Sequence, residues 1–437
     1  MKPMTLPLKA ARKQAELIGP LIRQLEIVVS RRQPADRVLQ RYYREHPELG
    51  SRDRRFLSAM AFSWFRWRGW LTPLEGARLA MAYMLDAVES HPAVTLLAEQ
   101  TGFSRFPPEA DLPMAENLQP AGPLSVQEKA KLLGQWLGVP PPPLEQLVPA
   151  WLPERLSVPE GAESKAHGVR YIESFQTRPP TWLRTSPAEQ QQVITALAQR
   201  SIPAYAHPQV VGAVRLQGSP DLRSFSREIP FEIQDLSSQC VGWVCRPARG
   251  ERWWDTCAGA GGKTLHLADL MENQGSILAT DIRAHSLDTL RARINRRHCG
   301  RIDCRVWDGI ADPALGQYFD GVLVDAPCSG IGTWARNPDA RWRTEENDIV
   351  ERRCIQEQLL KAAAEKVRSG GRLVYSVCTV TEVETAALTA WFLNLHPDFE
   401  LETFPHPLTG QPTNGLIRIQ PWEANCNAMF IARMKRS

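Results

Sequence analysis

Apolar residues in the first quarter of the chain recur every three or four positions, the spacing that places side chains on one face of an α-helix. The pattern runs from about Leu17 to Leu97. It predicts amphipathic helices that pack into a compact all-helical domain over residues 1–103. The repeating sets are Leu21, Leu25 and Val28, followed by Phe56, Met60, Trp64 and Trp67.

Proline interrupts this pattern between residues 104 and 165. Twelve prolines fall there, including the run Pro140–Pro143, and proline cannot support long helices or central strands. We predict a proline-rich connector with a short helix near Ser125–Leu137.

A small α+β module that contacts RNA is predicted over 166–245. Its expected elements are a strand at Thr181–Thr185, a helix at Pro187–Arg200 and a strand at Val211–Leu216.

From Gly250 onward, short strand-like runs alternate with helical segments. This alternation is typical of a doubly wound, mostly parallel sheet. We therefore predict a Rossmann-like α/β domain over residues 246–437. The candidate strands are Trp253–Trp254, Ser276–Thr280, Asp303–Trp307, Gly321–Val324 and Arg372–Ser376, with a long helix at Glu345–Arg368.

Charge is unevenly distributed along the chain. The net charge of all 437 residues is only +4, but Met1–Thr72 contains 15 Lys or Arg against 6 Asp or Glu. A basic segment suggests a polyanionic partner, although a solvated helical surface has the same composition. Trp64 and Trp67 fit the core stripe of a helix, which leaves Arg66 and Arg68 as the better candidates for contacts with nucleic acid.

All nine cysteines lie between Cys240 and Cys426. Their odd number, with no signal-like segment and no apolar run near 20 residues, favours reduced thiols in a cytoplasmic protein without a membrane span. The pairs Cys240/Cys245 and Cys299/Cys304 lack the further ligands of a tetrahedral metal set, so we expect no metal site.

The turn Asp255–Thr264 (Asp-Thr-Cys-Ala-Gly-Ala-Gly-Gly-Lys-Thr) follows the first predicted strand and opens a helix. Small residues there let the backbone approach a ligand closely. A phosphate-binding loop of an NTPase would need glycine where Cys257 stands, which argues against that alternative. Asp281, 22 residues after Gly259, is spaced to accept hydrogen bonds from ribose hydroxyls. Asp308, after the third strand, is placed to reach an adenine edge.

Two further segments end apolar runs with a cysteine, namely Val324–Ser329 (Val-Asp-Ala-Pro-Cys-Ser) and Val374–Thr379 (Val-Tyr-Ser-Val-Cys-Thr). In open α/β sheets the ligand crevice lies beyond the carboxyl ends of the strands. We therefore expect Asp325, Cys328 and Cys378 to meet there, whereas Cys299, Cys304, Cys354 and most of the others are expected to be inert buried side chains.

These segments resemble the signature motifs of the Sun/RsmB-type RNA 5-methylcytosine methyltransferases. The similarity extends over roughly Arg178 to the C-terminus and includes Phe231–Gln239. The helical domain is more weakly similar to the NusB-like RNA-binding domain of members that act on small-subunit rRNA. The chain departs from the family pattern at Ala260, Ser286 and Asn427–Ala428, which bears on cofactor affinity and the last hairpin.

The resemblance implies S-adenosylmethionine as cofactor and RNA as substrate, with rRNA favoured over tRNA and a monomeric protein expected. It implies that Cys378 adds to C6 of cytosine, that Cys328 helps to release the product, and that Asp325 holds N3. Lys263 would contact Asp325 or the base. The residues assigned to the cofactor are Cys257, Ala258, Gly259, Ala260, Gly261, Gly262, Lys263, Asp281, Asp308 and Asp325; those assigned to catalysis are Cys378, Cys328, Asp325 and Lys263.

Three alternatives remain open from the sequence. One is methylation of tRNA. Another is the reversed order of DNA cytosine methyltransferases, in which the thiol of a Pro-Cys turn attacks, so that Cys328 would be the nucleophile and Cys378 structural. The last is a non-catalytic RNA-binding factor in ribosome assembly that keeps the sheet only as a scaffold.

Overall fold

The computed structural model describes residues 6–87, 91–101, 124–157, 163–218, 220–222, 229–297, 299–314 and 316–437. The chain divides into two compact units. The helical unit comprises 1–154, 158–178 and 334–345, and the sheet unit comprises 155–157, 179–333 and 346–437. Much of the predicted connector, at 102–123 and 158–162, lies outside the described residues. The domain boundaries drawn from the sequence stay predictions.

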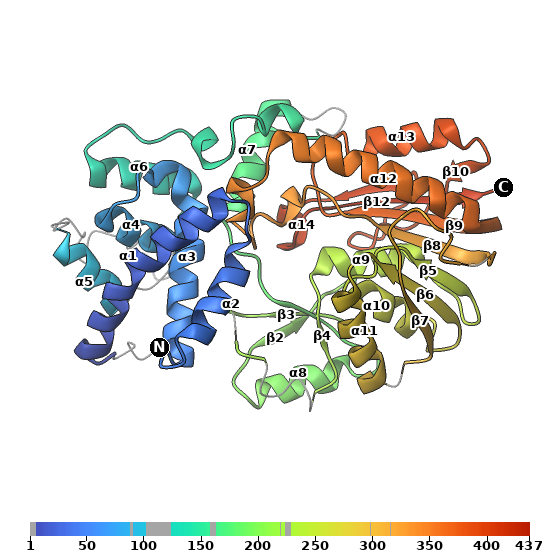
Figure 1. The fold of residues 1–437 in the computed structure, drawn as a ribbon, viewed down its shortest axis with the longest axis horizontal. Helices are drawn as coiled ribbons and strands as arrows, with labels where there is room; N and C mark the ends of the chain where they lie inside the picture. The colour runs from blue at the N-terminus through green and yellow to red at the C-terminus, as the bar shows by residue number, and fades with distance from the viewer. Residues whose placement is uncertain are drawn as a thin grey trace. The chain divides into compact units, whose positions relative to one another are not determined.

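The helical unit is formed by amphipathic helices whose apolar faces share one core. In α1 the residues Ala11, Ile18, Leu25 and Val29 are buried, as the spacing of three and four requires. The helices, coloured blue to green in Figure 1, are α1 (Leu8–Ser30), α2 (Ala35–Glu45), α3 (Ser51–Leu71), α4 (Gly76–Asp86), α5 (Pro92–Gln100), α6 (Val126–Leu137) and α7 (Ser164–Phe175), with a short 3₁₀ turn η1 (Leu144–Leu147).

The structure corrects the expectation that Arg66 and Arg68 are surface contacts. Arg66 is 1% exposed and pairs with Asp86 at 2.9 Å. Arg68 pairs with Glu26 at 2.8 Å and is only partly accessible. These arginines therefore pair with partly buried carboxylates within the unit, while the neighbouring Trp64 is in the core as predicted.

A segment distant in sequence, residues 334–345, belongs to the helical unit. Arg341 is fully buried there and donates to the carbonyls of Leu147 at 2.6 Å and Phe175 at 3.1 Å. Trp342 Nε1 donates to the Phe65 carbonyl at 2.6 Å. A division into consecutive domains does not anticipate this insertion, because its partners are far away in sequence.

The small module is a four-stranded antiparallel sheet in the order β2-β3-β1-β4. Leu183, Val193, Leu197 and Val214 form its core. Its elements are β1 (Trp182–Arg184), α8 (Gln190–Ala198), β2 (Ala204–Ala206), β3 (Ala213–Leu216) and β4 (Glu232–Ile233).

The main sheet has the order β10-β12-β9-β8-β5-β6-β7, with β11 paired to β12. The five strands from β9 to β7 are parallel, and β12 is antiparallel to β9. The strands are β5 (Arg252–Asp255), β6 (Ser276–Asp281), β7 (Arg301–Val306), β8 (Phe319–Asp325), β9 (Val367–Val377), β10 (Phe399–Leu401), β11 (Leu416–Ile419) and β12 (Met429–Arg436). The predicted fold class, a helical region followed by a Rossmann-like domain, is confirmed.

Helices cover both faces of this sheet. Trp253 packs on the α9/α10 side and Trp254 on the α12/α13 side, because successive side chains of a strand point to opposite faces. Strand order reverses between β5 and β8, so the topological switch point lies there. The helices are α9 (Leu236–Cys245), α10 (Gly262–Leu270), α11 (Ala284–Arg297), α12 (Glu346–Lys366) and α13 (Ala386–Leu395), with a short α14 (Pro421–Ala424).

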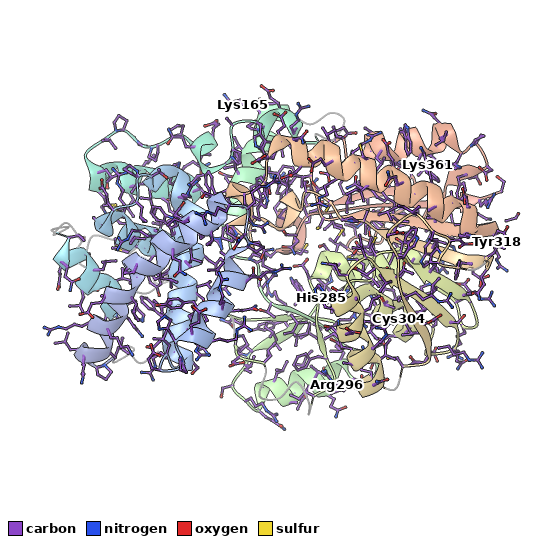
Figure 2. The ribbon with its side chains drawn as sticks, viewed as in Figure 1. Lys165, His285, Arg296, Cys304, Tyr318 and Lys361 are labelled. Atoms are coloured by element: carbon purple, nitrogen blue, oxygen red, sulfur yellow. The ribbon has the colours of Figure 1, made fainter. Side chains whose placement is uncertain are left out.

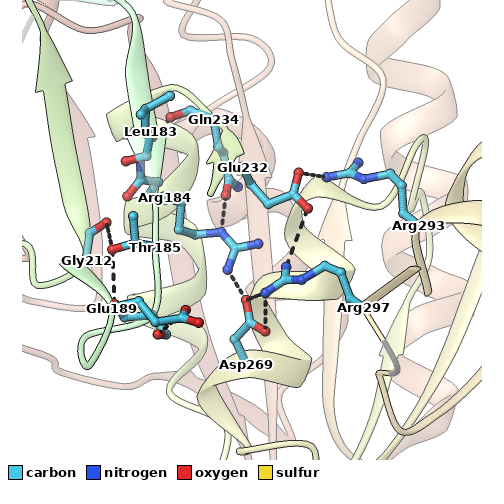
Figure 3. Close-up of polar contacts among 12 residues, drawn as sticks. Leu183, Arg184, Thr185, Glu189, Gly212, Glu232, Gln234, Asp269, Arg293 and Arg297 are labelled. Atoms are coloured by element: carbon cyan, nitrogen blue, oxygen red, sulfur yellow. Dashed lines mark hydrogen bonds and ion pairs between the residues drawn. The ribbon is translucent and has the colours of Figure 1, made fainter. Parts of the chain in front are cut away.

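An ionic network joins the small module to the main sheet within the sheet unit (Figure 3). Arg184, 3% exposed, pairs with Asp269 of α10, which also accepts from Arg297 at 3.0 Å. Glu232 of β4 pairs with Arg293 at 2.7 Å. Arg297 lies 3.6 Å from Glu232 as well, so both carboxylates have two arginine partners, and the shared Arg297 joins β4 to α10 in one network.

Arg341→Ala tests the inserted segment. It leaves the buried carbonyls of Leu147 and Phe175 without donors, so we expect the free energy of unfolding to fall by about 2–4 kcal/mol. Urea denaturation followed by Trp fluorescence measures this. The control Arg32→Ala removes an exposed ion pair with Glu345, in the same segment, and is expected to cost less than about 1 kcal/mol. Equal losses in both variants would contradict the buried role.

Candidate active site

The candidate site lies at the carboxyl ends of β5, β6, β8 and β9, where the parallel strands end at one edge of the sheet. Asp325 at the end of β8 is in register with Ser376 of β9. Because the two strands are hydrogen-bonded neighbours, the segments that follow them begin side by side. This pairing brings together residues about 50 positions apart in the chain.

The glycine-rich turn between β5 and α10 has the geometry of a ligand cradle. Gly259 and Gly261 have φ of +55° and +87°, which residues with a side chain rarely adopt. A Cβ at Gly261 would lie 2.1 Å from Leu290 Cδ1, so the turn is packed tightly against α11. The Gly259 N–H donates to Asp281 Oδ2 at 2.8 Å, which joins the turn to the acid at the end of β6.

Asp281 is 4% exposed, whereas Asp308 after β7 is exposed. Arg283 makes three hydrogen bonds to Asp281, through its backbone N–H, Nε and Nη2. These bonds lower the pKa of Asp281 although burial opposes them. Asp308 Oδ1 accepts from the Ile310 N–H at 3.0 Å, a local turn contact. The two carboxylates end neighbouring strands, which suits hydroxyl groups and a base edge of one nucleoside.

Lys263, the second residue of α10, reaches across to β8. Its Nζ donates to Asp325 Oδ2 at 2.7 Å, and the Ser376 hydroxyl donates to Asp325 Oδ1 at 2.8 Å. Burial by itself lowers the pKa of Lys263, but the ion pair with Asp325 outweighs it and raises that pKa above its ordinary value. The structure therefore brings Lys263 and Asp325 together, as expected, rather than leaving the lysine in solvent.

The two thiols of the motifs lie against each other, with Cys328 Sγ 3.5 Å from Cys378 Sγ. The two thiols share a hydrogen bond in which either sulfur can donate, and this bond lowers the pKa of Cys378 and raises that of Cys328. Burial and the charge of Asp325 raise the Cys378 pKa, whereas Lys263 lowers it. Cys378 is therefore the thiol that ionises first, and Cys328 keeps its proton.

The other cysteines differ from this pair. Burial raises the pKa of Cys257 to about 12 and holds the pKa values of Cys240 and Cys245 far above the ordinary range. Cys304 lies in the edge strand β7 (Figure 2), and burial raises its pKa as well. Low thiolate populations fit inert side chains.

Sequence reasoning missed several residues that complete the site. Glu384 accepts hydrogen bonds from Ser329 and Thr379, the residues directly after the two cysteines. The polar run after Cys378 was the available signal, because an acid within a turn rich in hydroxyls is a natural acceptor for them. Arg283 was also missed. It provides a cation next to Asp281, whereas Ser286 stands at a position where the family often has an arginine.

The other departures from the family pattern have local partners. The Ala260 carbonyl accepts from Arg293 Nη1, and the Asn427 N–H donates to Asp235 Oδ1 at 3.1 Å. The Ala428 N–H donates to the Gly332 carbonyl at 3.0 Å. The turn before β12 is thus held by hydrogen bonds within the sheet unit.

A doubly wound sheet with a glycine-rich turn, an acid at the second strand and apposed thiols at the switch point defines a Rossmann-like methyltransferase. Residues 243–435 match the family model described as 16S rRNA methyltransferase RsmB/F. The "Probable ribosomal RNA small subunit methyltransferase B" of Synechocystis sp. is 34% identical over 303 residues, covering 66% of this chain and 67% of the relative. The chain therefore belongs to the RsmB/F family and is an S-adenosylmethionine-dependent RNA methyltransferase.

Solved structures share the fold. The crystal structure of PH0851 has a TM-score of 0.72 at 24% identity and covers 100% of both chains. NSun6 from Pyrococcus horikoshii, crystallised with the S-adenosylmethionine analogue SFG, has a TM-score of 0.55 at 18% identity and covers 62% of this chain and 95% of that one. These likenesses show that the chain shares the fold of both proteins.

Within the described residues, the helices are all too short or too polar to cross a membrane. The same residues contain no group of three or more His, Cys, Asp or Glu side chains that could hold a metal ion.

The thiol pair predicts a pH effect. Cys328→Ala removes the thiol that is hydrogen-bonded to Cys378, so we expect the pKa of Cys378 to rise and the midpoint of its alkylation by iodoacetamide to move to higher pH. Peptide mass spectrometry across a pH series measures Cys378 alone. Cys354→Ala, at an exposed position of α12, is the control and should leave the midpoint in place. A midpoint that stays or falls in Cys328→Ala would show that the bond does not tune Cys378.

Proposed function

We propose that this chain methylates C5 of cytosine in small-subunit rRNA, with Cys378 as the nucleophile. The observation that carries the proposal is the 3.5 Å contact between Cys378 and Cys328 at the switch point of a methyltransferase sheet. C5 of cytosine is a poor nucleophile until a thiolate adds at C6, so this reaction needs an ionised thiol of the Cys378 kind.

In the first step Cys378 attacks. Its sulfur forms a bond to C6, and the electron pair displaced from the C5–C6 double bond is stabilised through N3. Asp325 and Lys263, which share a hydrogen bond of 2.7 Å, supply the proton and the charge at N3. S-adenosylmethionine, bound in the glycine-rich turn, supplies the methyl group that C5 accepts.

Release requires the C5 hydrogen to leave and the C6–sulfur bond to break. Cys328 retains its proton 3.5 Å from the Cys378 sulfur. It donates that proton to the departing Cys378 sulfur and, as a thiolate, takes the proton from C5. The proton at N3 returns to Asp325 and Lys263, both thiols end protonated and 5-methylcytosine leaves, so the proton count balances.

The cofactor assignment is also part of the proposal. The turn would hold the methionine part and Asp281 the ribose hydroxyls, while Asp308 would meet the adenine. The proposed cofactor residues are Cys257, Ala258, Gly259, Ala260, Gly261, Gly262, Lys263, Asp281, Asp308 and Asp325. Arg283 is 55% exposed and can move off Asp281 when the ribose binds.

Small-subunit rRNA is proposed as the substrate because the Synechocystis relative, which is 34% identical to this chain, is named for it. The helical unit supports an RNA partner. Many basic side chains on α1, in the turn after it, on α2 and at the start of α3 are exposed, namely Lys9, Arg12, Lys13, Arg23, Arg31, Arg32, Arg37, Arg41, Arg44, Arg52 and Arg55. Exposed cations bind phosphates without reading sequence. The NusB-like resemblance and the monomeric state stay predictions.

Methyl transfer tests the substrate. Incubation with labelled S-adenosylmethionine and unmodified small-subunit rRNA is expected to yield label in 5-methylcytidine, with bulk tRNA transcripts unlabelled. Nucleoside analysis of both RNAs measures this. Label only in tRNA would show that tRNA, and not small-subunit rRNA, is the substrate. Label in neither RNA would favour a non-catalytic assembly factor.

Substitution of each thiol tests the assignment. Cys378→Ala is expected to lose transfer by at least about 10³-fold and to form no covalent RNA adduct, because the attacking thiolate is gone. Cys328→Ala is expected to accumulate a denaturation-resistant adduct, because release fails. Denaturing gels with labelled RNA detect the adduct. An adduct in Cys378→Ala but not in Cys328→Ala would reverse the two roles.

A further inference from the structure

A buried carboxylate, Glu384, lies behind the two thiols in the turn between β9 and α13 and is 0% exposed. Its Oε1 accepts from the Ser329 N–H at 2.8 Å and from Gln356 Nε2 at 3.0 Å. Its Oε2 accepts from the hydroxyls of Ser329 at 2.5 Å, Thr381 at 2.9 Å and Thr379 at 3.2 Å. Five donors therefore converge on one carboxylate, which we call the Glu384 cluster.

The cluster holds the two cysteine turns to each other. Ser329 directly follows Cys328, and Thr379 directly follows Cys378. The hydroxyls of Ser329 and Thr379 are also 2.7 Å apart. Since Glu384 bonds to the residue after each thiol, a displacement of either turn would break bonds to the same carboxylate.

Further contacts fix the cluster to the sheet and to α12. Gln356 Nε2 also donates to the carbonyl of Pro327 at 3.0 Å, so Cys328 is held from the residue on each side. The Tyr375 hydroxyl donates to the Glu384 carbonyl at 2.7 Å, which ties the turn to β9. The Gly332 N–H donates to the Cys378 carbonyl at 3.0 Å.

An ionised carboxylate suits this position because it only accepts hydrogen bonds, and bonds to it are stronger than those between neutral groups. Its charge has the opposite effect on reactivity, since Glu384 raises the pKa of both Cys328 and Cys378. Because the Glu384 charge disfavours the attacking thiolate, the contribution of this carboxylate to the reaction is the geometry of the two cysteine turns.

We propose that Glu384 is a positioning residue that holds Cys328 and Cys378 at the separation required for thiolate activation and product release. This inference rests on the proposed cytosine methylation. Glu384 touches neither the cofactor turn nor Asp325, so it acts only through the two turns.

Glu384→Gln tests the geometry because the amide keeps the volume but places two N–H donors among groups that are already donors. We expect kcat for methyl transfer to fall at least about tenfold, because small displacements of reacting groups are costly. KM for RNA and for S-adenosylmethionine should stay within about twofold. The matched control is Glu382→Gln, two residues away, where the side chain is 48% exposed and pairs with Arg418; its kinetics should match those of the unsubstituted protein.

A double-substitution cycle separates positioning from a merely structural role and needs neither RNA nor cofactor. The midpoint of Cys378 alkylation is measured in four proteins: unsubstituted, Cys328→Ala, Glu384→Gln and the double variant. When Glu384 is present, Cys328→Ala should raise the pH midpoint of Cys378 alkylation. In the Glu384→Gln background the same substitution should have little effect, because there the thiols are already separated. Interacting residues give such non-additive effects.

Two results would overturn the inference. One is an equal shift by Cys328→Ala in both backgrounds, and the other is a kcat in Glu384→Gln within twofold of the unsubstituted protein. If the unsubstituted protein produces no 5-methylcytidine, the proposed function fails, whereas the alkylation cycle still decides whether Glu384 holds the thiols together.

Discussion

The site depends on the parallel pairing of β8 with β9. Register between these strands sets Asp325 opposite Ser376, and the turns that follow carry Cys328 and Cys378. The strands themselves are buried, apolar and covered by helices on both faces. Hydrophobic burial therefore fixes the backbone, and the backbone fixes the distance between two thiols that are separated by 50 positions in sequence.

Electrostatics at this edge of the sheet gives the two thiols different states. Lys263 and the Cys328 thiol lower the pKa of Cys378, while burial and the carboxylates of Asp325 and Glu384 raise it. The balance leaves one thiol that ionises and one that keeps its proton. A nucleophile next to a proton donor is the arrangement that both addition and release require, so a single contact serves two steps.

Two further groups of contacts maintain the geometry of the site. Asp281 is held between the Gly259 N–H and Arg283, which orders the cofactor turn before any ligand binds. The Glu384 cluster does the same for the thiols. Both arrangements use a carboxylate as an acceptor for several donors, which rigidifies turns that lack the hydrogen bonds of a strand.

The sequence alone determined the helical and Rossmann-like fold, because periodicity and glycine punctuation are local properties. It also singled out Cys328, Cys378 and Asp325 as a group, since their motifs end strands, and the family resemblance added Lys263. Only the tertiary structure decided that Arg66 is buried, that residues 334–345 join the helical unit, and that Glu384 connects the thiols. Each of these depends on partners brought together by packing, and no local pattern records which distant carbonyl or hydroxyl a buried charge will meet.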